Sequence, residues 1–360
     1  MWNSKQAQNN DLNKTQLKIW QYADLSLKKW GGVETHIRSV SDALHRTGVE
    51  VHISKELPPW LNGVNTSTVT ILHTHGIATP SLSMLRCYGR WASLVSTAKK
   101  NVIWMHVAHG TSIGRLIACG EYFSRSGWLG TARDFVPAQA AASVVAVSEQ
   151  VRSELKRYFK IKTPIAVISN GVHSNIYNKI DMLSSSRRIA FVGRGTDYVK
   201  NLETLIKAAQ IAHESCSRVG DNSVAPFELL LIPGDPRFHG LSFIKEFDNT
   251  PVGPEAVAAQ LRACRAVVLP SFYESDGIVL REAQAMGLYI VASDTPSIRQ
   301  NLSGYENAVL INPHNVEALA EVLIKASSIV YTPTPRVRDW DAVAQDFLNL
   351  YRTQLQSSAL

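Results

Sequence analysis

The sequence predicts an α/β protein built from two doubly wound domains, each with a parallel sheet and helices on both faces. Short apolar runs recur along the chain, and loops with glycine or proline separate them from stretches of helical apolar spacing. A length of 360 residues is sufficient for two domains with separate cores. No apolar run reaches the roughly 18 residues of a membrane span, so we expect no transmembrane helix.

The clearest unit of this kind runs from Ala266 to Asp294. Its first apolar run, Ala266 to Leu269, has the length and composition of a buried parallel strand. Apolar residues then fall at helical spacing from Ile278 to Met286, and Gly287 is typical of a helix end. The run from Tyr289 to Ala292 predicts the next strand. The segment therefore forms a strand–loop–helix–strand unit.

The loop and the helix of this unit combine two kinds of ligand group. The first backbone N–H groups of the helix, near Gly277, Ile278 and Val279, are free to attract an anion such as a diphosphate. Glu274 in the loop and Glu282 on the helix supply carboxylates, which accept hydrogen bonds from sugar hydroxyls. A site for phosphate and for a diol together indicates a nucleotide-sugar ligand.

Two glutamates are a weak signal in a chain with 30 acidic residues, where both could be solvated surface charges. The longer pattern is Pro-Ser, an aromatic residue, Glu, Gly, then Glu-Ala-x-Ala-x-Gly and another strand. It resembles the signature of the retaining GT-B glycosyltransferases of glycosyltransferase family 4, and the resemblance extends over nearly the whole chain. It implies two Rossmann-like domains facing each other across a cleft. It also implies retaining transfer of a sugar from a nucleoside diphosphate sugar, of UDP or GDP type, to an acceptor hydroxyl.

The resemblance assigns roles to two further loops. Arg194 and Lys200, which follow the glycine Gly193, resemble the arginine–lysine pair that grips the donor diphosphate in the family. Charged donors on two sides would neutralise the leaving group as the sugar–phosphate bond breaks. Gly31 and Gly32 resemble the glycine loop that the family places beside the donor phosphates and the acceptor, although a tight turn is the alternative.

Histidines follow two predicted strands of the first domain. His109 comes directly after the apolar run from Val102 to Ala108, at the end of a parallel strand where ligands bind. In the family a histidine in this context contacts the donor sugar, so we expect His109 to be catalytic, with His106 as the rival. His73 and His75 could ligate a metal, but no third ligand is in view. We therefore expect no metal site and metal-independent transfer.

We expect an acceptor-side domain over residues 1–178, a nucleotide-sugar domain over 179–335, and a C-terminal helix over 336–360 that returns to the first domain. Residues 1–178 carry 20 Lys and Arg against 10 Asp and Glu, a net charge of +10. Residues 179–360 carry 17 against 20, a net charge of −3. This split predicts an anionic membrane surface near the first domain, with basic and aromatic residues at 86–91 and 152–162. A solvated basic face is the alternative.

Other features limit the partners. The four cysteines show no CxxC or metal spacing, and the N-terminus lacks a signal-peptide core, so we expect a cytoplasmic protein, with peripheral attachment to the inner face of the cytoplasmic membrane as an option. No nucleic-acid motif accompanies the basic charge.

The resemblance implies an acceptor in lipopolysaccharide, exopolysaccharide or glycolipid assembly, while the identities of the sugar and of the nucleotide base stay open. The alternatives to a glycosyltransferase are a phosphorylase or sugar epimerase of the same fold and a non-catalytic partner subunit. A dehydrogenase is disfavoured, because the Gly-x-Gly-x-x-Gly motif follows none of the predicted strands.

Overall fold

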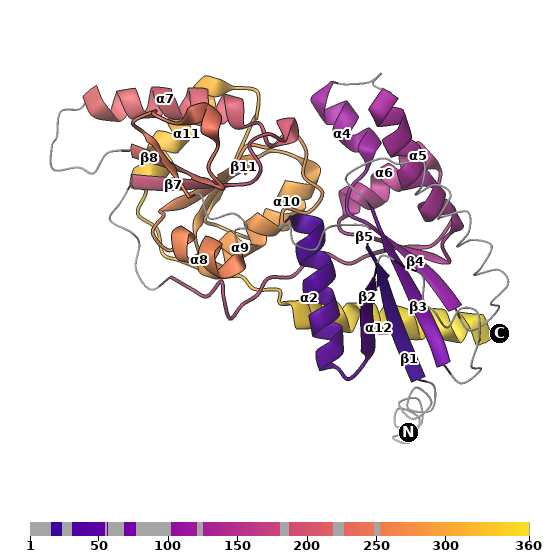
Figure 1. The fold of residues 1–360 in the computed structure, drawn as a ribbon. Helices are drawn as coiled ribbons and strands as arrows, with labels where there is room; N and C mark the ends of the chain where they lie inside the picture. Colours follow the sequence, from indigo (N-terminus) through magenta and orange to yellow (C-terminus); the bar gives the residue numbers. More distant parts are fainter. Residues whose placement is uncertain are drawn as a thin grey trace. The chain divides into compact units, whose positions relative to one another are not determined.

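Two six-stranded parallel sheets form the centres of two structural units in the computed structural model (Figure 1). The first unit comprises residues 1–170 and 340–360, and the second comprises residues 171–339. Within them the structure describes residues 16–23, 31–54, 56, 68–76, 102–120, 125–180, 187–218, 227–247 and 253–359.

The first boundary between the units, at residues 170 and 171, lies before the expected position 178, and the second, at residues 339 and 340, lies after the expected position 335. Val172 forms a parallel bridge with Asp339. The backbone N–H of Ile180 donates to the carbonyl of Met286 at 3.1 Å, and the Tyr177 ring is buried in the core of the second unit. The polar, Ser-rich composition of residues 173–188 is typical of a linker between domains. Their few apolar side chains instead anchor them to the second unit.

The sheet of the first unit has the strand order β2-β1-β3-β4-β5-β6, and every neighbouring pair is parallel. All side chains of β4 and β5 are buried, as the near-continuous apolar runs of a doubly covered sheet require. The strands are β1 (Gln16–Tyr22), β2 (Glu50–Ser54), β3 (Thr68–His75), β4 (Val102–Ala108), β5 (Ser143–Ala146) and β6 (Ile165–Val167).

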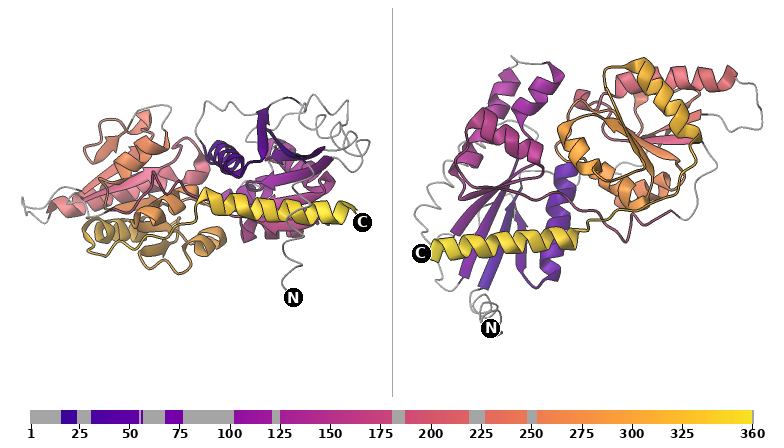
Figure 2. Two further views of the ribbon diagram at one scale, coloured as in Figure 1. Left: turned by 90° about the horizontal axis from the view of Figure 1, so that it is seen from below. Right: turned by 180° about the vertical axis from the view of Figure 1, so that it is seen from behind.

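The helices of this unit bury apolar stripes against the sheet. In α2, Ile37, Val40 and Leu44 fall at helical spacing and are fully buried. The C-terminal helix α12 packs beside α2 and runs across the strands (Figures 1 and 2), which places it in the first unit. The helices are α2 (Gly32–Arg46), α4 (Ser112–Cys119), α5 (Arg125–Ala140), α6 (Glu149–Phe159) and α12 (Trp340–Ala359).

The second unit contains a parallel sheet of order β12-β11-β10-β7-β8-β9. Its strands are β7 (Arg187–Val192), β8 (Phe227–Ile232), β9 (Ile244–Glu246), β10 (Ala266–Leu269), β11 (Tyr289–Ser293) and β12 (Ala308–Ile311). Its helices are η3 (Tyr198–Lys200), α7 (Leu202–Arg218), η4 (Pro236–Phe238), α8 (Pro254–Leu261), α9 (Ile278–Met286), α10 (Pro296–Leu302) and α11 (Val316–Ser328).

Alternate residues of these strands point to two separate cores. In β10, Ala266 and Val268 face the core under α7 and α11, whereas Val267 and Leu269 face the core under α8, α9 and α10. This period of two places helices on both faces of the sheet. The two units together confirm the predicted α/β architecture with two doubly wound sheets. Among the described residues, no helix is both long and apolar enough to cross a membrane.

Candidate active site

The strand order reverses once in each unit, and three predicted site residues of the second unit follow the strands at its reversal. In the second unit the reversal lies between β7 and β10; Gly193 and Arg194 follow β7, and Glu274 follows β10. In the first unit it lies between β1 and β3, where His75 ends β3. Ligands of doubly wound sheets bind at the carboxyl ends of strands at such positions.

Lys200 and Glu274 form a direct ion pair, which joins two residues that the sequence had placed in separate loops. Lys200 Nζ donates to Glu274 Oε1 at 2.5 Å, and Ser271 Oγ donates to the same oxygen at 2.8 Å. The carboxylate is only 7% exposed, so the ammonium and the hydroxyl compensate a nearly buried charge. One oxygen of Glu274 is thereby fixed in position.

Asn201 connects the loop after β7 to the loop after β10. It adopts a left-handed conformation with a φ of 56°, which ends η3 directly after Lys200. Its side-chain amide donates to the carbonyl of Pro270 at 3.0 Å and to that of Pro313 at 2.8 Å. These bonds hold Lys200 against the β10 loop. Arg194, by contrast, is exposed, and its carbonyl accepts from the Asp197 N–H at 3.0 Å.

Helix α9 begins at Gly277 without a side-chain cap. Gly277 has a φ of 71°, a left-handed conformation that costs an L-residue about 1–2 kcal/mol. No side-chain oxygen caps this end, so the backbone N–H groups of Ile278 and Val279 remain available to an anion. Anion binding at the start of this helix stays a prediction, with which the uncapped N-terminus is compatible.

Glu282 lies one turn further along α9 and is buried. It shares a side-chain hydrogen bond with Tyr177, and burial raises the pKa of the Glu282 carboxyl to about 7. Burial, with Glu282 as a second cause, also raises the pKa of the Tyr177 hydroxyl. Because its pKa is about 7, the carboxyl group exists in both protonation states near neutral pH. It can therefore accept a hydrogen bond from a ligand hydroxyl or donate one to it.

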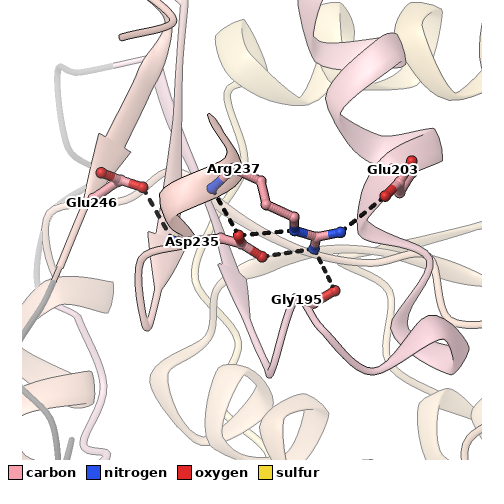
Figure 3. Close-up of polar contacts among 5 residues, drawn as sticks. All are labelled: Gly195, Glu203, Asp235, Arg237 and Glu246. Carbon is pink, nitrogen blue, oxygen red and sulfur yellow. Dashed lines mark hydrogen bonds and ion pairs between the residues drawn. The ribbon is translucent and has the colours of Figure 1, made fainter. Parts of the chain in front are cut away.

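A salt-bridge network next to this site was missed by the sequence analysis (Figure 3). Arg237 Nη2 donates to the carbonyl of Gly195 at 2.8 Å and to Asp235 Oδ2 at 2.7 Å. Nη1 of the same guanidinium donates to Glu203 at 2.9 Å. A Cβ at Gly195 would collide with the carboxylate of Asp235, so only glycine permits this approach. Arg237 thus fixes the backbone next to Arg194.

Three histidines of the first unit come together. His75 Nδ1 lies 3.0 Å from His109 Nε2, and the ring of His36 meets that of His109 edge-on, with centroids 4.5 Å apart. Burial, followed by the neighbouring histidines, holds the pKa of His75 and of His109 well below its ordinary value, so both rings are neutral. His36 lies in the first turns of α2, which Gly31 and Gly32 begin.

The rival histidine, His106, is a core residue. Its Nδ1 lies 2.9 Å from Thr74 Oγ1, and burial lowers the pKa of its imidazole to about 3. His73 is equally buried, and its Nε2 lies 3.0 Å from the hydroxyl of Tyr351 on α12. Of the four histidines on or directly after β3 and β4 in the described residues, His109 is the one that is partly exposed. The third histidine that the sequence did not reveal is His36.

Comparisons with known proteins agree with this arrangement. The profile described as Glycosyl transferases group 1 matches residues 186–328, and the profile described as Glycosyltransferase Family 4 matches residues 57–175. An uncharacterized glycosyltransferase of Methanocaldococcus jannaschii is 23% identical over 95% of this chain and 99% of its own. A D-inositol 3-phosphate glycosyltransferase of Rhodococcus erythropolis is 32% identical, over 28% of this chain and 25% of its own.

Solved structures share the fold. A sucrose-phosphate synthase from Thermosynechococcus elongatus superposes with a TM-score of 0.67 at 17% identity, covering 95% of this chain and 100% of its own. The catalytic domain of starch synthase IV from Arabidopsis thaliana, bound to ADP and acarbose, reaches a TM-score of 0.59 at 10% identity, covering 95% and 99%. Both show the GT-B fold alone.

The fold and the two matched profiles define a glycosyltransferase enzyme with two Rossmann-like domains. Within that class, the chain belongs to the group 1 glycosyltransferases of glycosyltransferase family 4, as its motifs predicted.

Proposed function

We propose that this enzyme transfers a sugar, with retention at the anomeric carbon, from a UDP- or GDP-type sugar to an acceptor hydroxyl. One observation carries the proposal. The Lys200 ammonium is bonded to the Glu274 carboxylate, and Gly277 starts an uncapped helix three residues after that carboxylate. A cation, a fixed carboxylate and free helix N–H groups suit a ligand that joins a sugar to a diphosphate.

The predicted site residues of the second unit divide the chemistry among them. Arg194, Lys200 and the N–H groups of Ile278 and Val279 bind the diphosphate and stabilise its growing charge as the sugar–phosphate bond breaks. The acceptor oxygen forms the new bond on the same face of the sugar, and its proton passes to the departing phosphate oxygen. Because Lys200 and Ser271 both donate to Oε1 of Glu274, the other carboxylate oxygen, Oε2, orients the transferred sugar.

Glu282 has the environment of a ribose-binding carboxyl. Its burial and its bond with Tyr177 hold it in place inside the unit. Hydrogen bonds to ribose hydroxyls exist in the ground state and the transition state alike, so they contribute to donor affinity rather than to turnover. Removing them with Glu282→Ala should raise the dissociation constant of the nucleotide.

The first unit contributes His109 and the glycine loop at Gly31 and Gly32. The neutral ring of His109 is suited to a hydrogen bond with a sugar hydroxyl, which needs no charge compensation. The glycine loop leaves the α2 N-terminus without a side-chain cap, which suits close approach of a polar ligand. We propose no metal for the transfer itself.

We also propose that the acceptor is membrane-borne, in lipopolysaccharide, exopolysaccharide or glycolipid assembly. Near the end of α6, Lys156, Arg157, Lys160 and Lys162 are exposed, next to the partly exposed ring of Tyr158. Within the predicted basic stretch 152–162, Arg152 is instead paired with Glu149 at 2.6 Å, and Phe159 is buried. The other predicted basic stretch, residues 86–91, lies outside the described residues.

A two-stage experiment tests the function. Thermal-shift screening against UDP-, GDP- and ADP-sugars identifies the donor, because a ligand at 100 times its dissociation constant stabilises by about 2.7 kcal/mol. Release of free nucleotide is then measured with and without candidate acceptors. Acceptor-dependent release, with the product retaining the anomeric configuration by NMR, supports the proposal. Release or isomerisation without any acceptor would indicate an epimerase instead, and no stabilisation by any nucleotide sugar would indicate a non-catalytic subunit.

A further inference from the structure

Three imidazoles from separate elements converge in the first unit. His36 lies on α2, His75 ends β3, and His109 follows β4. One ring nitrogen from each lies within 4.8 Å of the other two. Across the described part of the chain, these are the three residues that form a group with metal-ligand geometry. Imidazole favours zinc, copper, nickel and related ions over magnesium and calcium, which prefer oxygen.

The outer nitrogens of two of these rings are held by side-chain amides. His75 Nε2 lies 2.7 Å from Gln21 Oε1, and His36 Nδ1 lies 2.7 Å from Asn170 Oδ1. An amide oxygen can only accept, so each of these nitrogens carries its ring's proton. His75 Nδ1 and His36 Nε2 therefore keep their lone pairs. Metal-binding histidines have this arrangement, because a second hydrogen bond fixes the tautomer and the ring orientation.

The distances fit a tetrahedral ion after small adjustments. Two nitrogens bound to one zinc at about 2.0–2.1 Å are roughly 3.3 Å apart. His75 Nδ1 and His109 Nε2 are 3.0 Å apart. In the metal-free site, His109 Nε2 carries the proton and donates it to His75 Nδ1. When a metal binds, this proton moves to His109 Nδ1, so the lone pair of His109 Nε2 becomes available to the ion. The His36 nitrogen lies within 4.8 Å of the other two, so a side-chain shift of at most about 1.5 Å brings it to the same centre.

We propose that His36, His75 and His109 bind one divalent transition-metal ion, best matched by zinc, with a fourth position open to water or an anion. We propose further that this ion inhibits transfer, because its binding to His109 Nε2 puts a proton on His109 Nδ1, the nitrogen that would otherwise accept a hydrogen bond from the sugar. The inhibition rests on the proposed function of His109, whereas the binding does not. The transfer itself is proposed to need no metal, and the metal site shares His109 with it.

The binding is tested on chelator-treated full-length protein. Cobalt is titrated first, because it gives intense visible absorption in four-coordinate sites, and zinc is then added to displace it. We expect one equivalent of bound cobalt in the wild type and loss of the band in His36→Gln and His75→Gln. His45→Gln, which changes an exposed histidine on the same helix α2, is the matched control and should bind as the wild type does.

Two variants keep the test valid if the ligand variants fail to fold. Gln21→Leu and Asn170→Ala remove the outer bonds and leave all three imidazoles in the chain, and we expect metal affinity to fall roughly 10- to 100-fold. Wild-type protein without a one-equivalent band, or unchanged affinity in folded Gln21→Leu and Asn170→Ala, would overturn the site. Zinc should also inhibit transfer in the wild type at a concentration that rises at least about tenfold in Asn170→Ala. Stoichiometric metal binding without inhibition would overturn the proposed inhibition and leave the metal site standing. A protein that binds the metal but shows no transfer activity would overturn the proposed function and leave the metal site standing.

Discussion

Lys200 and Glu274 lie 74 positions apart in the sequence, yet the Lys200 ammonium sits 2.5 Å from the Glu274 carboxylate. This contact joins the group proposed to bind the diphosphate with the group proposed to orient the sugar. The two residues therefore act as one unit. Without Lys200, the Ser271 hydroxyl is the one side-chain hydrogen-bond partner that the described part of the chain leaves to the nearly buried carboxylate.

The first prediction concerns this pair. Lys200→Ala should lower kcat/KM by roughly 10²–10³-fold, the loss of about 2–4 kcal/mol typical of removing one preorganised donor. Glu274→Ala should act mainly on kcat. The double variant should lose less than the two single losses combined, with a coupling of about 0.5–3 kcal/mol. Steady-state kinetics of the wild type and of all three variants complete this double-mutant cycle.

Lys207→Ala is the matched control for this prediction. Lys207 is exposed on α7, in the same unit, and its removal should leave the kinetics within a factor of about two. Additive losses for Lys200 and Glu274 would show that their contact does not matter for transfer.

Local patterns predicted the elements, whereas contacts between distant loops had no local signal. The apolar run at Ala266–Leu269 and the helical spacing at Ile278–Met286 match β10 and α9 residue for residue, because burial imposes those periods on the sequence. Arg237 gave no such signal. Its partner Gly195 lies 42 positions away, and an arginine in a polar loop looks the same whether it binds a carbonyl or solvent.

The histidines show the same limit. The sequence showed His73 and His75 two positions apart, but only the fold brings His36 to His75 and sends His73 into the core beside Tyr351. The sequence favoured His109 over His106 because His109 follows the predicted strand, and the structure adds that His106 is buried whereas His109 is partly exposed. Side-chain direction at a strand end depends on the packing of several elements, so residue type and spacing cannot supply it.

The second prediction concerns the pH dependence of stability through Glu282. Burial raises the pKa of this carboxyl from 4.5 to about 7 in the folded chain. Between these values the unfolded chain has lost the proton that the folded chain keeps. The free energy of unfolding therefore falls as the pH rises from about 4.5 to about 7, by an amount on the order of 3 kcal/mol.

Glu282→Gln removes this titration and keeps the shape. Its free energy of unfolding should equal that of the wild type near pH 4.5 and should exceed it by a growing amount up to pH 8. Urea unfolding at both pH values measures the difference. Glu321→Gln changes an exposed glutamate on α11 and should show no such pH-dependent difference. A wild-type stability that does not fall relative to Glu282→Gln across this window would refute the raised pKa.

The third prediction concerns Arg237. Arg237→Ala should lower the free energy of unfolding by about 1–3 kcal/mol, because Asp235 is nearly buried and loses its bidentate partner; partial exposure of Arg237 limits the effect. Arg237→Lys should not restore it fully, since lysine lacks the planar fork. Thermal unfolding measures both. Glu203→Ala, which removes only the exposed partner, should cost about 0–1 kcal/mol. Equal losses for Arg237→Ala and Glu203→Ala would contradict the assigned role.

The fourth prediction concerns the membrane surface. Each basic residue near an anionic surface contributes about 1 kcal/mol, so the Lys156→Glu and Arg157→Glu double variant should bind anionic vesicles at least tenfold more weakly than the wild type. Sedimentation with vesicles at low and high salt measures this binding, and salt should weaken it. Lys207→Glu, in the second unit, serves as the control. Wild-type protein that stays in the supernatant at low salt would point to a soluble acceptor.

The central claim is that Arg194, Lys200 and the start of α9 hold the donor diphosphate. Calorimetric titration with the nucleoside diphosphate and with the matching nucleoside monophosphate tests it most directly. The wild type should bind the diphosphate more tightly, and Arg194→Ala and Lys200→Ala should each reduce that preference about tenfold or more, the effect of about 1.4 kcal/mol or more per charged contact. Unchanged diphosphate affinity in both variants, with folded protein and saturable binding, would contradict the claim.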